Sequence, residues 1–196
     1  SIKIFQEPYF MDRLKLYDKI FNTIEKWNTF TKELQKYNNE QEYFEDYNRV
    51  KDNAILNIKQ SEAYIRFNLD DMNKYKVINN NISNNAIFKP TNDNRCFISI
   101  DIKKANFSAL RHYDKEMFNT DTWEEFISKF TTNEHIINSK YIRQVILGNC
   151  NPKRHITYEK FLTDSILSQL IKDIVDIDSV VFLSNDEIVI DFTDIS

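Results

Sequence analysis

The sequence contains a single glycine, Gly148, among 196 residues. Loops that cradle phosphates and turns that bind dinucleotides need several glycines, because their backbone N–H groups must approach the phosphate closely. The scarcity of glycine therefore excludes a P-loop or Rossmann-type nucleotide site.

Cysteine and histidine are also scarce. The two cysteines, Cys96 and Cys150, are too few for a disulfide framework, and neither belongs to a Cys-x-x-Cys pair. The three histidines (His112, His135 and His155) are too dispersed along the chain to predict a zinc site. This usage predicts an intracellular, reducing location such as the cytoplasm or a viral replication site.

Long apolar runs are missing as well. No run approaches the roughly 20 residues that a membrane span requires, and the chain opens at Ser1 without a charged and then apolar leader. We therefore expect no membrane contact and no secretion signal. With 41% hydrophobic residues, the chain can bury one ordinary core with a helical appendage.

The first 61 residues show helical periodicity. Apolar positions recur at spacings of three, four or seven from Tyr9 to Tyr37, which predicts one long amphipathic helix, and Pro8 suits its first turn. A second helix is predicted from Tyr43 to Gln60. We expect an antiparallel helical hairpin as the first domain (1–61), whose aromatic stripe is either core or a surface for a partner helix.

The rest of the chain mixes strand and helix patterns. Alternation predicts a strand over 63–69 with Arg66 on its open face, then a polar loop over 70–94. A second strand is predicted from Cys96 to Ile102 and continues into a helix that reaches Arg111. Three further helices are predicted over 122–130, 134–147 and 157–175.

The C-terminal region predicts a β-hairpin. Two apolar runs, 180–183 and 188–190, flank the four polar turn-formers Ser184-Asn185-Asp186-Glu187. Together these elements predict an α+β second domain (62–196) with a small antiparallel sheet that carries helices on one face.

Two acidic positions give this sheet a candidate site. Asp101 lies near the C-terminal end of the strand 96–102, and an acid at that edge of a sheet faces the crevice where ligands bind. Asp186 and Glu187 lie at the hairpin tip. Mg²⁺ favours one or two carboxylates plus substrate phosphates, and two such ions can clamp a phosphoryl displacement.

Simpler interpretations of these acids stay open. Asp101 could be the N-cap of the following helix, because Asp is favoured there and satisfies N–H groups of the first turn. Asp186 and Glu187 could form a solvated turn, the common fate of acids in hairpins.

The segment Asp101-Ile-Lys-Lys-Ala105-Asn-Phe-Ser108 resembles the first palm motif of reverse transcriptases and related template-dependent polymerases. In that motif an Asp is followed by an apolar residue and, four positions after the Asp, by a small residue before an aromatic. Residues 184–187 are similar to the third motif, usually Tyr-x-Asp-Asp, and the Asp-Glu ending is similar to that of bacterial-type family A DNA polymerases. The resemblance covers about 66–191.

The resemblance implies a palm-like domain that uses Mg²⁺ or Mn²⁺. Asp101 and Asp186 would hold the metal ions, with the backbone carbonyl of Ile102 as a further ligand. Glu187 would be the auxiliary acid. A second motif of the Pro-Gln-Gly type is missing, and only Gln144 and Gly148 lie in the corresponding region.

The resemblance also implies residues that contact the nucleoside triphosphate. Three of them precede the first motif and three lie within it: Arg66, Lys74, Lys76, Lys103, Lys104 and Asn106. Asn106 occupies the position where reverse transcriptases place a bulky aromatic that excludes a ribose 2′-hydroxyl. A polar side chain can instead hydrogen-bond that hydroxyl, so weak sugar discrimination or a ribonucleotide preference is expected.

The formal net charge of −4 argues against a protein whose whole surface binds nucleic acid. A basic strip between Lys140 and Lys160 is a local exception. Such a strip could follow a phosphate backbone. The residues assigned to nucleic-acid binding are Lys140, Arg143, Lys153 and Arg154. The alternative interpretation is a solvated helix face.

The sequence therefore predicts a metal-dependent nucleotidyltransferase, a polymerase palm core of a virus or mobile element, that extends or binds nucleic acid. Its rival is a catalytically silent replication-accessory or protein-interaction module that docks a protein partner through the N-terminal helices. A third interpretation is a structural component without nucleic-acid contact.

Overall fold

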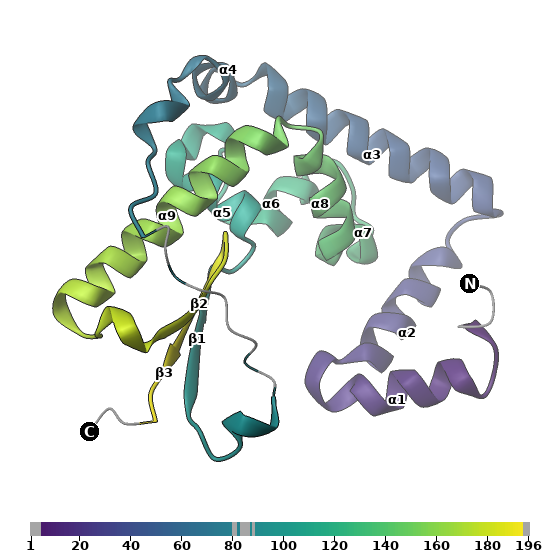
Figure 1. The fold of residues 1–196 in the computed structure, drawn as a ribbon. Helices are drawn as coiled ribbons and strands as arrows, with labels where there is room; N and C mark the ends of the chain where they lie inside the picture. Colours follow the sequence, from purple (N-terminus) through teal and green to yellow (C-terminus); the bar gives the residue numbers. More distant parts are fainter. Residues whose placement is uncertain (1–4, 80–81, 83–86, 88, 194–196) are drawn as a thin grey trace. The chain divides into compact units, whose positions relative to one another are not determined.

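The computed structural model describes residues 5–79, 82, 87 and 89–193, and the chain divides into two compact units. The first unit is Ser1–Ala54 with Asp121–Ile146, and the second is Ile55–Thr120 with Leu147–Ser196. The described part of the chain is mostly helical with a three-stranded antiparallel sheet, which confirms the predicted mixture of helix and sheet (Figure 1). None of its helices is long and apolar enough to cross a membrane.

The first unit is helical. It contains α1 (Tyr9–Phe21), α2 (Thr23–Leu34), most of α3 (Glu40–Gln60), α6 (Trp123–Ser128), α7 (Glu134–Asn138) and most of α8 (Lys140–Gly148). Its large buried apolar side chains come from α3, α6, α7 and α8. They include Val50, Trp123, Phe126, Ile127, Ile136, Ile142 and Ile146.

Two predicted helices of this unit are each broken in two. The prediction of one helix over 9–37 is wrong, because Asn22 adopts a left-handed conformation with φ of 50° and separates α1 from α2. The Asp18 carboxylate accepts a hydrogen bond of 2.8 Å from the Ile24 N–H and so satisfies a donor at the start of α2. Ser139 is extended and separates α7 from α8, where one helix was predicted over 134–147.

The second unit contains the sheet. In chain order it holds the end of α3, α4 (Glu62–Leu69), η2 (Met72–Lys74), η3 (Pro90–Asn92), β1 (Phe97–Asp101), α5 (Ala105–Tyr113), η4 (Lys115–Met117), α9 (Pro152–Asp173), η5 (Ile177–Ser179), β2 (Val180–Leu183) and β3 (Glu187–Asp191). Part of the predicted loop 70–94 lies outside the described residues, namely 80–81, 83–86 and 88.

The predicted strand over 63–69 is wrong, because this segment is the helix α4. Ser61 caps the helix by accepting a hydrogen bond from the Tyr64 N–H, and the buried residues Ala63 and Phe67 lie four positions apart on one helical face. An alternation of apolar and polar residues over seven positions is compatible with a short helix as well as a strand.

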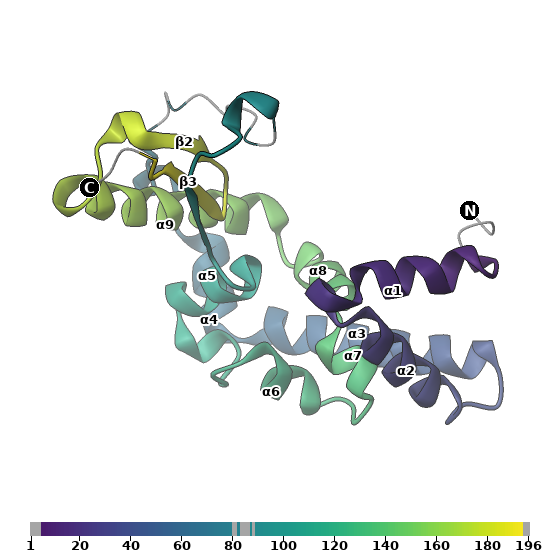
Figure 2. The same ribbon diagram turned by 90° about the horizontal axis from the view of Figure 1, so that it is seen from below.

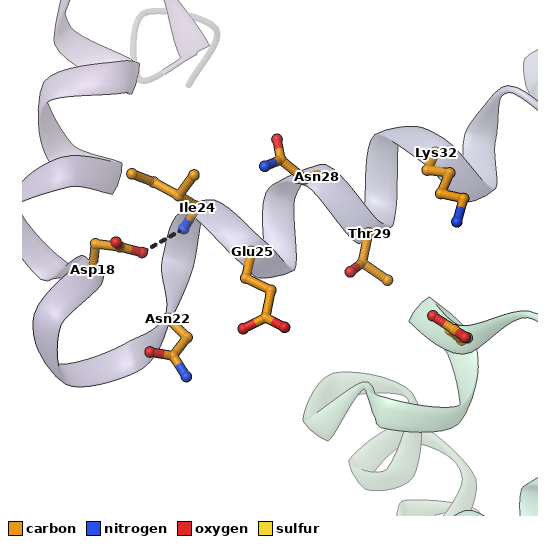
Figure 3. Close-up of a pocket in the computed structure, with 8 residues that line it drawn as sticks. Asp18, Asn22, Ile24, Glu25, Asn28, Thr29 and Lys32 are labelled. Carbon is orange, nitrogen blue, oxygen red and sulfur yellow. Dashed lines mark hydrogen bonds between the residues drawn. The ribbon is translucent and has the colours of Figure 1, made fainter.

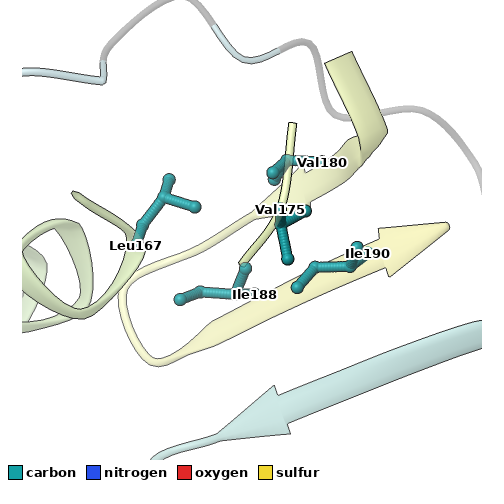
Figure 4. Packing of buried hydrophobic residues seen from close by; sticks show 5 residues of the cluster. All are labelled: Leu167, Val175, Val180, Ile188 and Ile190. Atoms are coloured by element: carbon teal, nitrogen blue, oxygen red, sulfur yellow. The ribbon is translucent and has the colours of Figure 1, made fainter. Parts of the chain in front are cut away.

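The sheet has the order β1-β3-β2, so the hairpin and the strand predicted over 96–102, which is observed as β1 over 97–101, are confirmed. In the register, Ile98 lies opposite Ile190 and Ile100 lies opposite Ile188. The helix α9 runs along the sheet (Figure 2). Apolar residues from α9, the following turn and both hairpin strands pack together in Figure 4: Leu167, Val175, Val180, Ile188 and Ile190.

Candidate active site at the hairpin turn

The strand register brings the predicted acids to one end of the sheet. Asp101, the last residue of β1, lies opposite Glu187, the first residue of β3. The Ile102 N–H donates a hydrogen bond of 2.8 Å to the carbonyl oxygen of Asp186. Directly opposite residues in an antiparallel pair have Cβ atoms about 4.5–5.5 Å apart. Residues separated by 84 and 86 positions in the sequence are therefore neighbours in space.

Two of the acids share one face of the sheet. Side chains alternate along a strand, and Ile100 and Ile188 point toward α9 in the buried cluster, so Asp101 and Glu187 share the opposite face. Ser99 lies on the same face and donates a hydrogen bond of 2.6 Å from its Oγ to Glu187 Oε1. The register thus places Asp101 opposite Glu187, the residue that the resemblance assigns as the auxiliary acid.

The hairpin turn that carries Asp186 is held by its own hydrogen bonds. The Ser184 Oγ accepts hydrogen bonds from the backbone N–H groups of Asp186 (3.3 Å) and Glu187 (3.0 Å). The same hydroxyl lies 3.1 Å from Asp186 Oδ1 and donates to it. From α9, the buried Thr163 Oγ1 donates a hydrogen bond of 2.7 Å to the carbonyl of Asn185. The turn is therefore fixed to the helix that supports the sheet.

The connection from β1 to α5 tests the interpretation of Asp101 as a helix cap. The N-cap of α5 is Lys104, with φ of 53° and ψ of 49°, and it makes no side-chain capping hydrogen bond. The N-cap position of α5 is therefore occupied by Lys104 and not by Asp101. Within the first turn, Asn106 Oδ1 accepts a hydrogen bond of 2.9 Å from the Phe107 N–H. Lys103 is exposed on the connection.

Two predicted nucleotide contacts are in ion pairs elsewhere in the second unit. Arg66 lies on α4 and donates to the carboxylates of Asp114 at 2.6 Å and Glu116 at 3.2 Å. Lys74 lies 2.6 Å from Asp70 Oδ1. Lys76 is exposed in the segment that follows η2.

The predicted nucleic-acid contacts do not share one unit. Lys140 and Arg143 belong to the first unit, where Arg143 is only 8% exposed and burial lowers the pKa of its guanidinium against an opposing effect of Glu124. Lys153 and Arg154 belong to the second unit. Arg154 donates to the Phe67 carbonyl at 2.7 Å and also to the Asp70 carbonyl, so it caps the C-terminal end of α4.

Asp70 is a polar centre that sequence reasoning missed. Its carboxylate accepts hydrogen bonds from Lys74 Nζ (2.6 Å), the Tyr75 hydroxyl (2.7 Å) and the Tyr113 hydroxyl (3.0 Å). These donors, Lys74 first, lower the pKa of Asp70 to about 2, and burial together with Asp70 raises the pKa of Tyr113 to about 12. Asp70 therefore joins α4, η2 and α5.

A pocket of about 470 Å³ adjoins the hairpin turn. Its lining combines the turn residues 184–186 with Val77, Asn79, Ile82, Leu183 and the exposed Lys160 of α9. Asp186 thus faces a cavity that also contains a cation. Lys160 belongs to the basic strip of the sequence, but no pattern in the sequence places it beside Asp186.

A second pocket, of about 450 Å³, lies in the first unit between α2 and α7 (Figure 3). Its lining mixes acids, amides and a cation, including Glu25, Asn28, Lys32 and Glu134. The acids of the palm-type motifs are not part of it. The cavity therefore offers a polar surface without the chemistry that the sequence predicts.

The end of the sheet offers few side chains that could bind a metal ion. In the described part of the chain, no group of three or more His, Cys, Asp or Glu side chains is arranged to hold a metal ion. Asp101 and Glu187 supply two carboxylates on one face, which matches the ligand number that Mg²⁺ takes from proteins when substrate phosphates complete its shell. The donor set is therefore compatible with a metal that binds together with its substrate.

Comparisons of the chain with protein-family models, curated proteins and solved structures find no match.

Proposed function

We propose that this chain is a metal-dependent nucleotidyltransferase of the polymerase palm type that extends nucleic acid with nucleoside triphosphates. The observation that carries the proposal is the end of the sheet, where Asp101 lies opposite Glu187 and Ile102 is hydrogen-bonded to Asp186. These residues belong to the two segments that resemble polymerase motifs.

The surrounding contacts support a site with a defined geometry. Ser99 donates a hydrogen bond to Glu187, and Ser184 donates one to Asp186. Thr163 of α9 donates a hydrogen bond to the Asn185 carbonyl and so fixes the turn to the helix. Catalytic groups act best when hydrogen bonds and packing hold them in place before substrate arrives. The Ser184 contacts are those of an ordinary polar turn. The hydrogen bonds from Thr163 and Ser99 connect the turn and Glu187 to neighbouring elements, and these two contacts favour a functional turn.

The carboxylates of Asp101 and Glu187, with Asp186 in the adjacent turn, would hold Mg²⁺ or Mn²⁺. When bound, such ions neutralise charge on the α-phosphate and on the pyrophosphate leaving group, and they lower the pKa of the attacking 3′-hydroxyl. The role of the protein is to hold the acidic side chains in position. Ser99 keeps Glu187 on the face of Asp101, and the fixed turn keeps Asp186 at the end of the same sheet.

A primer-extension assay tests the proposal. Purified protein is incubated with labelled primers on DNA and RNA templates, nucleoside triphosphates and Mg²⁺ or Mn²⁺. We expect extension by the wild type and a loss of at least about 100-fold for Asp101→Asn and for Glu187→Gln, a range typical of lost transition-state stabilisation.

The matched control is Asp178→Asn in η5, which makes the same change of charge on an exposed residue. It should extend primers like the wild type. Equal extension by wild type and Asp101→Asn would contradict the assignment of Asp101. Titration with Mn²⁺, followed by the loss of the free-ion electron paramagnetic resonance signal, adds a readout that does not require turnover: Asp101→Asn should bind less Mn²⁺.

A second candidate function is a protein-interaction module. It is favoured by α1, which buries no side chain in the described structure and exposes Leu16 (63%) and Ile20 (74%) on adjacent turns. A folded protein that neither extends primers nor retains Mn²⁺ would support this function over the enzyme.

A further inference from the structure

The pocket beside the hairpin turn has two walls that are anchored to neighbouring residues of α9. Thr163 holds the turn through the Asn185 carbonyl at 2.7 Å. Asp164, only 3% exposed, holds the other wall: its carboxylate accepts the N–H groups of Ile78 at 2.8 Å and Asn79 at 3.0 Å. A buried carboxylate is retained only when such hydrogen bonds compensate its desolvation. The pocket is therefore built by dedicated contacts.

The wall residue Asn79 is itself oriented. Its Nδ2 donates to Asp164 Oδ1 at 2.8 Å and to Ser168 Oγ at 3.1 Å. Because both donors of the amide are used within the protein, its carbonyl oxygen is the group that can accept a hydrogen bond from a ligand. Asn79 lines the pocket together with Asp186.

Lys160 gives the pocket its positive charge. Across the residues with described positions, no carboxylate lies within 4.0 Å of the Lys160 ammonium, whereas Arg66 and Lys74 each pair with an acid. A lysine without an acidic partner is available to bind a phosphate as a point charge. The pocket also has an apolar part, which consists of Val77, Ile82 and Leu183.

The size of the pocket suits a small ligand. Its volume of about 470 Å³ lies within the range of about 300–1,000 Å³ that is usual for small-molecule sites. An apolar wall can contact a nucleobase, a carboxylate and an amide oxygen can accept hydrogen bonds from sugar hydroxyls, and an ammonium can bind phosphate. These three kinds of group occur together in one ligand class, the nucleoside phosphates.

We infer that this pocket binds a nucleoside phosphate, with Lys160 on the phosphate, Asp186 and Asn79 at the sugar, and Val77, Ile82 and Leu183 against the base. The inference rests on the proposed function in one respect, because Asp186 belongs to both sites. It adds a specific cation, Lys160, that the polymerase resemblance does not assign. It also assigns Asp164 as a positioning residue for the pocket wall.

Equilibrium binding without template and without metal tests the inference. Isothermal titration in the presence of EDTA compares ATP, GTP, CTP and UTP with adenosine and with inorganic triphosphate. We expect the nucleoside triphosphates to bind more tightly than either adenosine or inorganic triphosphate. Lys160→Gln should weaken nucleoside triphosphate binding at least 10-fold and leave adenosine binding unchanged.

Lys172→Gln is the matched control, because Lys172 is a lysine in the last turn of the same helix and is not part of the pocket lining. It should bind like the wild type. Asp164→Asn, with folding checked by circular dichroism, should weaken adenosine and nucleoside triphosphates alike, since it loosens the wall and leaves Lys160 in place. Equal binding by wild type and Lys160→Gln, or no binding by the wild type, would overturn the inference.

The outcome is separable from that of the primer-extension assay. Metal-free nucleotide binding that depends on Lys160, without any primer extension, supports the pocket and contradicts the polymerase function. Primer extension by Lys160→Gln with unchanged KM for nucleotides, and no metal-free binding, supports the polymerase function and contradicts the pocket.

Discussion

Helices α9 and α1 are both amphipathic, yet they are held in place differently. Helix α9 packs Leu167 against the sheet and also uses the buried polar residues Thr163 and Asp164 to fix two loops. Helix α1 buries no side chain within the described structure. Apolar packing alone tolerates small shifts, whereas directional hydrogen bonds fix a loop at one position. The contrast shows that α9 positions the hairpin turn and the segment 78–79 through directional contacts.

The largest expected effect concerns the core of the sheet. Ile188→Ala removes a side chain that is 1% exposed, and we expect a loss of about 2–5 kcal/mol in the free energy of unfolding, as for other buried aliphatic residues. Ile20→Ala in α1 is the matched control, because Ile20 is 74% exposed, and it should change stability by less than about 0.5 kcal/mol.

The measurement must distinguish the two units. Both tryptophans, Trp27 and Trp123, lie in the first unit, so tryptophan fluorescence in urea reports on that unit. Amide hydrogen exchange of β1 and β3 reports on the sheet. A large effect of Ile20→Ala in fluorescence, or none of Ile188→Ala in exchange, would break the comparison between α9 and α1.

The next effect concerns the polar anchors of α9. Asp164→Ala leaves the N–H groups of Ile78 and Asn79 without their acceptor, which should cost about 1–3 kcal/mol. Asp178→Ala, at an exposed position in the same unit, should cost much less. Faster amide exchange confined to residues 78 and 79 would show that Asp164 acts on the pocket wall, and a uniform change throughout the unit would argue for a general loss of packing.

The hydrogen bonds that Thr163 and Asp164 make could not be predicted from the sequence. The central strand and the hairpin follow from local patterns, and the structure contains both. The pairing of Asp101 with Glu187 depends on strand register, and the contact of Asp164 with Ile78 joins residues 86 positions apart. Neither contact leaves a local signal in the sequence.

The errors have equally local causes. Alternation over 63–69 resembled a strand, but the Ser61 cap and the spacing of Ala63 and Phe67 suited a helix that packs within the second unit. In the first unit, the apolar periodicity continued through Asn22, and the left-handed turn there interrupted the helix without interrupting the pattern. Periodicity detects buried faces more reliably than it detects breaks.

A smaller effect concerns Asp70, which should make the stability of the second unit depend on pH in acid. The folded pKa of Asp70 is about 2, below its ordinary value of 3.8, so the unfolded chain takes up a proton first as the pH falls. The stabilising contribution of Asp70 is therefore complete above pH 3.8 and is lost as the pH falls toward 2. Asp70→Asn should reduce this dependence in sheet hydrogen exchange and leave tryptophan fluorescence of the first unit unchanged.

The smallest effect compares two left-handed residues, one in each unit. Lys104 in the connection after Asp101 has φ of 53°, and Asn22 between α1 and α2 has φ of 50°. The left-handed conformation costs an ordinary L-residue about 1–2 kcal/mol, while Asn adopts it more readily. Glycine removes the cost but loses more conformational entropy on folding, about 0.5–1 kcal/mol.

Lys104→Gly should therefore stabilise the second unit by about 0.5–1 kcal/mol, and Asn22→Gly should leave the first unit nearly unchanged, as measured by hydrogen exchange and by tryptophan fluorescence in urea. Backbone strain is retained where the surrounding structure requires it, and it concentrates at functional sites. A Lys104→Gly protein that is more stable than the wild type would show that the backbone at this connection carries strain. Destabilisation by Lys104→Gly would instead show that the lysine side chain contributes contacts worth more than the strain that its backbone carries.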